Sequence, residues 1–188
     1  MDMLVDLWMA IVASAVGVWI LAAIFWMVLP HHQKDYQPLG DEAGFSASLR
    51  SLGVGAGNYS FPYCSGKADH KDPEFIARWK EGPTGFLTVL GGWSMGRNMV
   101  LTLLVYLVVS VFVAYVTGLA LEPGASFWKV FQVAGTCGVM AYTFGGIPNA
   151  IWFGASRHSV LMNVIDGVAY GLLVGVVFAL LWPAGVGG

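Results

Sequence analysis

Apolar and polar positions form long blocks along this chain, and the apolar blocks set its architecture. Four apolar runs, at residues 8–29, 99–121, 127–147 and 161–182, interrupt an otherwise mixed sequence. Each is long enough to cross the roughly 30 Å hydrocarbon layer of a bilayer, which takes about 20 helical residues. The pattern predicts an all-α fold, a four-helix transmembrane bundle that forms a single integral membrane domain over residues 1–188.

The charges on either side of these runs predict how the chain is oriented. The segment MDMLVD before the first run is acidic and no small-residue cleavage pattern follows Pro30, so we interpret this run as a retained anchor rather than a secretory signal. Most lysines and arginines lie between the first and second runs, and cytoplasmic flanks carry the excess of positive residues. We therefore expect a bacterial inner-membrane protein with both termini outside, in the periplasm.

The polar connection at residues 30–96 predicts two short helices that lie on the membrane surface or against a partner. Asp41 is placed to cap a helix that ends near Leu52. Asp72 with Pro73 marks the start of a second helix, and Gly82 marks its end. Residues 84–95 are apolar but too short to span, so we expect an interfacial segment that leads into the second run, with a re-entrant segment as the alternative.

Small residues recur four apart in the last two apolar runs. In lipid, helices associate through close backbone approach, which small side chains allow. We expect helix-packing stripes either within this chain or between chains. One stripe comprises Gly167, Gly171, Gly175 and Ala179, and the other Ala134, Gly138, Ala141 and Gly145.

Polar residues near the predicted cytoplasmic ends of the runs form a second candidate set. Arg97 and Asn98 open the second run, Asn149 follows the third, and Asp166 lies near the start of the fourth. Such residues are costly in a bilayer and usually have partners, so we expect a structural clasp in which Arg97 pairs with Asp166. A substrate or proton gate is the alternative.

Histidine and carboxylate side chains follow the first run and raise the question of a metal site. His31, His32 and Asp35 are close in sequence, and His70 lies further along the same connection. Imidazole and carboxylate groups bind zinc and iron, but no CxxC or HExxH pattern is present. We expect no metal and no other cofactor, and keep these four residues as candidates for a metal site.

Several segments resemble a family of small bacterial multi-pass membrane proteins for which no activity is established. They are LPHHQKDYQPLGDE at 29–42, GNYSFPYC at 57–64, KEGPTGFLTVL at 80–90 and IPNAIWFG at 147–154. The resemblance implies a bacterial origin and a multi-pass topology. It assigns no functional residue.

Composition argues against nucleic-acid binding, and three candidate functions remain. With 57% hydrophobic residues, 11% charged residues and a net charge of -2, the chain has no clustered basic face for nucleic acid. It contains no nucleophile motif or phosphate-binding loop in a suitable context, so we expect no enzyme. We expect an accessory or structural subunit of a larger membrane complex, in contact with lipid and with other integral subunits or a second copy. The alternatives are a homo-oligomeric channel or transporter for small solutes and a metal-dependent membrane enzyme.

Overall fold

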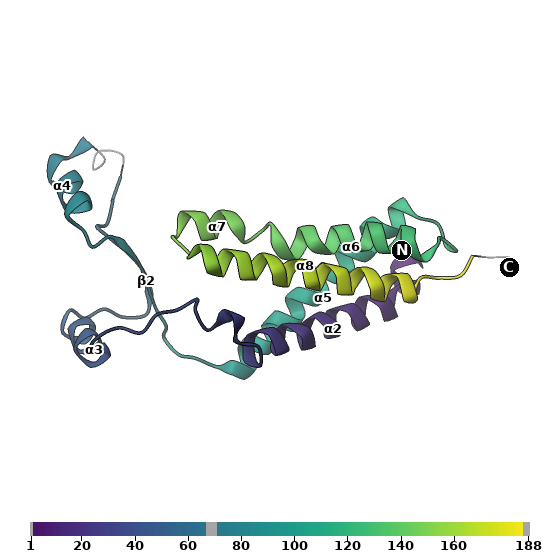
Figure 1. Cartoon of the computed structure of the whole chain (residues 1–188), viewed down its shortest axis with the longest axis horizontal. Coiled ribbons are helices and arrows are strands. Elements are labelled where there is room, and N and C mark those ends of the chain that lie inside the picture. Colours follow the sequence, from purple (N-terminus) through teal and green to yellow (C-terminus); the bar gives the residue numbers. More distant parts are fainter. Residues whose placement is uncertain (1, 67–70, 186–188) are drawn as a thin grey trace. The chain divides into compact units, whose positions relative to one another are not determined.

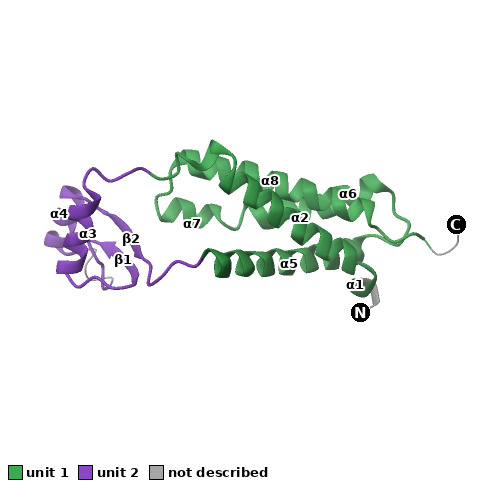
Figure 2. Ribbon diagram, turned by 90° about the horizontal axis from the view of Figure 1, so that it is seen from below, with its two compact units in different colours: residues 1–36, 95–188 green, residues 37–94 purple. Residues whose placement is uncertain are grey.

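The structure, a computed structural model, describes residues 2–66 and 71–185. The chain separates into two compact units (Figure 2). Residues 1–36 and 95–188 form the first, here called the helical unit, and residues 37–94 form the second, here called the connection unit. All the long apolar helices found among the described residues belong to the helical unit. A single integral membrane domain over residues 1–188 stays a prediction.

The helical unit contains four helices long and apolar enough to cross a membrane, which fits a multi-pass membrane protein. Three are α2 (Trp8–Met27), α5 (Met95–Ala120) and α8 (Arg157–Leu180), and the fourth combines α6 (Phe127–Thr143) with the short α7 (Ile147–Trp152). A short helix α1 (Asp2–Asp6) precedes α2, and a 3₁₀ helix η1 (Pro30–His32) follows it. The third apolar run is thus broken by a turn after Thr143, where a continuous helix was expected.

These helices pack along one another through buried apolar side chains. Helix α8 lies along α6 (Figure 1), α2 contacts both α5 and α8, and α5 also contacts α6. Val18, Val130 and Phe178 are fully buried at these contacts. Large apolar side chains on the outer faces remain exposed, for example Phe112 and Leu119 on α5. An apolar outer surface of this kind suits contact with lipid.

The closest contact in the unit is between α6 and α8, where glycine meets backbone. A Cβ atom added to Gly171 would overlap the backbone nitrogen of Val139, and one added to Gly138 would lie 2.9 Å from the Cα of Gly171. A Cβ atom at Gly175 would likewise lie 2.9 Å from the Cα of Gly135. The two backbones therefore approach as closely as glycine permits.

The other members of the two predicted stripes differ in their surroundings. A Cβ atom on Gly167 would meet Thr143, Ala134 is fully buried, and Ala179 packs against the core. Ala141 and Gly145 are exposed: Ala141 lies two residues before the end of α6, and Gly145 lies in the turn that follows Thr143.

The connection unit holds two short helices and a pair of strands. Helix α3 (Glu42–Ser51) begins after Asp41, whose carboxylate accepts a hydrogen bond from the Gly44 backbone nitrogen at 2.8 Å. Helix α4 (Pro73–Glu81) begins after Asp72, which accepts from the Glu74 backbone nitrogen at 3.1 Å. It ends at Gly82, whose φ of +67° favours glycine. The two short helices of the connection are confirmed.

The strands correct the expectation of an all-α fold. Strands β1 (Gly57–Phe61) and β2 (Gly85–Val89) pair antiparallel, with Tyr59 opposite Leu87 and Ser60 opposite Phe86. The segment expected to lead into the second span is therefore partly a strand. Strands β1 and β2 are separated in the sequence by α4, so no short turn between them indicates the pairing. The apolar residues at 85–89 were therefore interpreted as a segment at the membrane interface.

We expect Gly171→Ala to destabilise the helical unit by about 1–3 kcal/mol, because the new methyl group must displace the backbone of α6. The measurement is the apparent melting temperature of the detergent-purified chain, which should fall by several degrees. Gly145→Ala is the matched control, since nothing lies within 4 Å of a Cβ atom there. Equal melting temperatures for both variants would contradict the close packing of α6 on α8.

Candidate functional site

The main polar cluster of the helical unit surrounds Asp166 on α8. This residue is only 2% exposed, although it lies inside a helix apolar enough to span a membrane. The Nε2 atom of His31 lies 3.0 Å from Asp166 Oδ1, and the Nε2 atom of His32 lies 2.9 Å from Asp166 Oδ2. Each carboxylate oxygen thus has its own imidazole. We call His31, His32, Asp35 and Asp166 the His–Asp site.

The end of α2 positions the two imidazole rings. Two residues separate the end of α2 from Pro30, where the η1 turn begins, so the two histidines follow the helix closely. The ring of Trp26 stacks on His32 with 3.8 Å between centroids and 8° between planes. The ring of Phe25 meets His31 edge-on at 5.5 Å. Aromatic side chains in the last turn of α2 therefore fix both rings where they face α8.

A second carboxylate completes the site. The Oδ2 atom of Asp35 lies 2.6 Å from His32 Nδ1, so both ring nitrogens of His32 contact a carboxylate. Burial by itself lowers the pKa of His32, but the hydrogen bonds and negative charges of Asp166 and Asp35 together raise this pKa above its ordinary value. In this hydrogen-bonded state the site favours an imidazolium held between two carboxylates.

One oxygen of the site has no partner. The side chain of Asp35 is 3% exposed, and within residues 2–66 and 71–185 its Oδ1 atom accepts no hydrogen bond. Buried carboxylate oxygens are normally satisfied, and an unsatisfied one is costly. The hydrogen-bond donors of the site therefore do not satisfy every carboxylate oxygen of Asp35 and Asp166.

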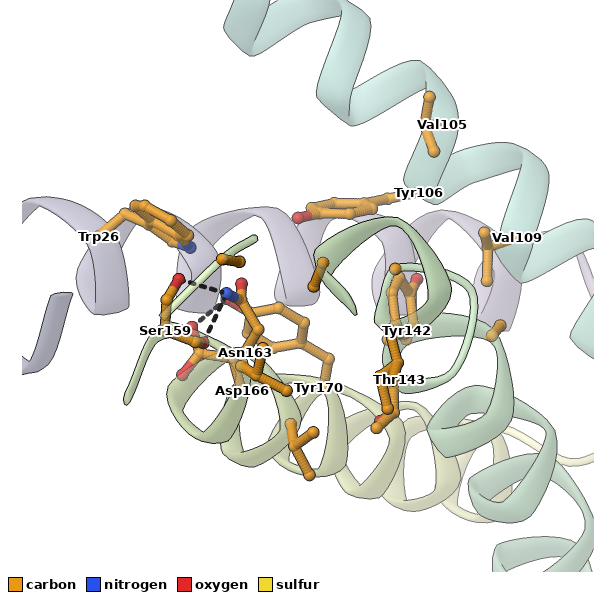
Figure 3. Close-up of a pocket in the computed structure, with 18 residues that line it drawn as sticks. Trp26, Val105, Tyr106, Val109, Tyr142, Thr143, Ser159, Asn163, Asp166 and Tyr170 are labelled. Carbon is orange, nitrogen blue, oxygen red and sulfur yellow. Dashed lines mark hydrogen bonds between the residues drawn. The ribbon is translucent and has the colours of Figure 1, made fainter. Parts of the chain in front are cut away.

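A pocket of about 480 Å³ borders Asp166. Tyrosines from three helices line it, namely Tyr106 of α5, Tyr142 of α6 and Tyr170 of α8 (Figure 3). Tyr142 meets both Tyr106 and Tyr170 edge-on, with centroids 5.4 and 5.8 Å apart. The Tyr170 hydroxyl lies 3.4 Å from Asp166 Oδ2. The cavity thus combines aromatic walls with a carboxylate, a setting that suits a small ligand or an ion.

The structure brings together residues that the sequence assigned to two different candidate sets. Asp166 was expected to pair with Arg97 in a clasp, and its hydrogen bonds go to His31 and His32. His31, His32 and Asp35 come from the candidate metal set. The fourth member of that set, His70, lies outside the described residues.

The remaining clasp residues lie on other elements at the ends of the spans. Arg97 and Asn98 are in the first turn of α5, where the Asn98 carbonyl accepts a hydrogen bond from Thr102 at 2.8 Å. Asn149 lies in α7 and is exposed. The clasp of four residues stays a prediction, whereas the His–Asp site has a defined geometry.

The aromatic side chains around the His–Asp site were not predicted from the sequence. Tyr170 lies four residues after Asp166, so both side chains share one face of α8. Phe25 and Trp26 stand a few residues before the histidine pair, in the last turns of the first apolar run. The pattern that could have indicated this site is an aromatic pair shortly before two histidines, together with an aspartate inside a later span.

Comparison with known proteins adds no relative to this picture, since no protein family, curated protein or solved structure matches the chain. The resemblance to a bacterial membrane family therefore stays a prediction.

We expect Asp166→Asn to destabilise the helical unit by about 3–5 kcal/mol, because it leaves buried donors without their carboxylate. The measurement is the apparent melting temperature in detergent. Asp6→Asn is the control, since Asp6 is exposed and such substitutions change stability by about 0.5 kcal/mol or less. Full stability of Asp166→Asn would show that these hydrogen bonds do not hold the unit together.

Proposed function

We propose that this chain is an accessory or structural subunit of a membrane protein complex, and that its connection unit binds a neighbouring subunit. The observation that supports this role is the lack of a core in the connection unit. Among the described residues of that unit, Phe75 is the only buried hydrophobic side chain. A unit of this size cannot stabilise itself without burying more apolar surface.

Large apolar side chains of the connection unit are exposed on each of its elements. Leu52 follows α3 and is 75% exposed, Trp79 on α4 is 54% exposed, and Trp93 after β2 is 68% exposed. Side chains of this size that stay exposed outside a spanning helix mark a binding surface. The connection unit is therefore suited to contact with other molecules along much of its length.

The strand pair favours a protein partner over the membrane surface as that contact. Successive side chains of a strand point to opposite faces, and residues opposite each other in an antiparallel pair share a face. Tyr59 and Phe61 therefore lie on one face of the β1–β2 pair, and Phe86 lies on the other. All three are exposed. A bilayer surface covers one face, whereas a partner subunit that encloses the pair covers both.

The location that we propose is a bacterial inner membrane with both chain ends in the periplasm. The uneven distribution of lysine and arginine supports this orientation, because the connection at residues 30–96 carries most of them. The exposed apolar faces of the spanning helices contact lipid and leave room for integral subunits or a second copy.

The His–Asp site favours a second candidate function, a metal-dependent membrane protein. Two imidazoles and two carboxylates converge at one end of the helical unit, beside a pocket. That candidate is tested separately from the accessory role, because it depends on different residues.

We expect the chain to migrate with at least one stoichiometric neighbour when native membranes are extracted in a mild detergent. The measurement is native mass spectrometry, which distinguishes a complex from the 20.1 kDa monomer and identifies a second copy by its mass. The double variant Trp79→Ser and Phe86→Ser should lose the neighbour, because it removes exposed apolar contacts without touching the helical unit.

Leu119→Ser is the matched control. It removes a similar apolar side chain, 68% exposed, from the outer face of α5, and should leave the complex intact. A wild-type chain that leaves the native membrane as a monomer would contradict the accessory role. Loss of the neighbour in Leu119→Ser alone would place the contact on the spanning helices instead.

A further inference from the structure

The His–Asp site has the donor set of a divalent metal centre. The Nε2 atoms of His31 and His32 and a carboxylate oxygen of Asp166 all lie within 4.8 Å of one another. Two imidazoles with one carboxylate bind zinc and non-haem iron in many proteins. We propose that His31, His32 and Asp166 bind one divalent transition-metal ion, with Asp35 as a positioning residue. This site does not depend on the accessory role.

The spacing of the donor atoms fits a shared ion. The two Nε2 atoms lie 3.0 and 2.9 Å from their carboxylate oxygens. Two ligand atoms that are each about 2.1 Å from one ion are about 3.0 Å apart at an octahedral angle and about 3.4 Å apart at a tetrahedral angle. The separations in the site are therefore close to those of coordinated ligands. The ion takes the place of the two Nε2 protons.

Asp35 has the position of a supporting carboxylate. A histidine that binds a metal through one ring nitrogen usually donates the proton on its other nitrogen to a carboxylate, which fixes the tautomer. Asp35 Oδ2 lies 2.6 Å from Nδ1 of His32, on the side of the ring away from Asp166. With the proton held on Nδ1, loss of the Nε2 proton leaves a lone pair on the side of the ring that faces Asp166, where the ion binds.

The charge of the site also favours a cation. Once the ion has replaced the Nε2 protons, the two ionised carboxylates of Asp35 and Asp166 give its surroundings a formal charge of about -2, which a divalent ion neutralises. Both carboxylates are 3% exposed, so water does little to screen them. The Oδ1 atom of Asp35 belongs to one of these carboxylates and has no hydrogen-bond partner among the described residues, so the donors of the protein leave it available to a cation.

The chemistry of the donors narrows the class of metal. The site offers nitrogen and oxygen ligands without a thiolate, which suits zinc, iron(II) or manganese(II) better than copper(I). His31 is 22% exposed at its side chain, which gives an ion a path to the site. The pocket borders the carboxylate of Asp166, so water or a small ligand in it can reach this carboxylate.

The test is direct metal analysis of the full chain, purified in detergent with an affinity tag that contains no histidine. The protein is stripped with EDTA and dialysed against zinc, and its metal content is measured by mass spectrometry. We expect about one zinc ion per chain, and cobalt(II) in its place should give the absorption bands of nitrogen and oxygen ligation. A folded chain that takes up no zinc and no cobalt would overturn the proposal.

Variants assign the ion to this site. We expect His31→Gln and Asp166→Asn to lose the bound ion, and Asp35→Asn to keep every ligand but bind it about 10–100-fold more weakly, with a shifted cobalt spectrum. His158→Gln is the control, because this nearby histidine is not among the proposed ligands and its Nε2 atom hydrogen-bonds to the backbone carbonyl of His31.

The other possible results of the variant series also show whether the ion binds at the His–Asp site. Zinc that stays bound in both His31→Gln and Asp166→Asn lies elsewhere, and the proposal is then wrong. If Asp166→Asn does not fold, His31→Gln serves alone, because its ring is the most exposed part of the site. A cobalt spectrum of Asp35→Asn identical to that of the wild type would remove Asp35 from its positioning role.

Discussion

A carboxylate buried inside an apolar helix constrains the rest of the helical unit. Asp166 is 2% exposed in α8, and a charge at such a position is stable only with close partners. Its partners, His31 and His32, come from the segment that leaves α2, so the chain must bring the end of α2 against α8. The aromatic side chains of Phe25 and Trp26 then hold the imidazoles in place. One polar contact thereby couples the first spanning helix to the last.

Close packing of α6 on α8 supplies the second condition. Because Gly138 and Gly171 let the two backbones approach, the turns on either side of this contact are held in a fixed relation. Tyr142 and Tyr170 contact each other next to these glycines and line the pocket beside Asp166. The glycines thus have a structural role that extends to the site, since the position of the tyrosines depends on the separation of the helices.

The sequence predicted what depends on local pattern and missed what depends on distant pairs. The apolar runs predicted the spanning helices, and Asp41 and Asp72 predicted the starts of α3 and α4, because length and capping are local properties. The β1–β2 pair was missed because its strands are separated by α4. His31 and Asp166 were both singled out, but in different sets, because the predicted topology puts both at the cytoplasmic ends of their runs without showing which runs are neighbours.

The central claim is that Asp166 and the imidazoles of η1 act as one unit. A double-mutant cycle on His32→Gln and Asp166→Asn, with stability measured in detergent, tests it most directly. The account predicts that the double variant loses less stability than the sum of the two single variants, by about 0.5–3 kcal/mol. Strictly additive losses would show that the two side chains do not interact, and would contradict the account.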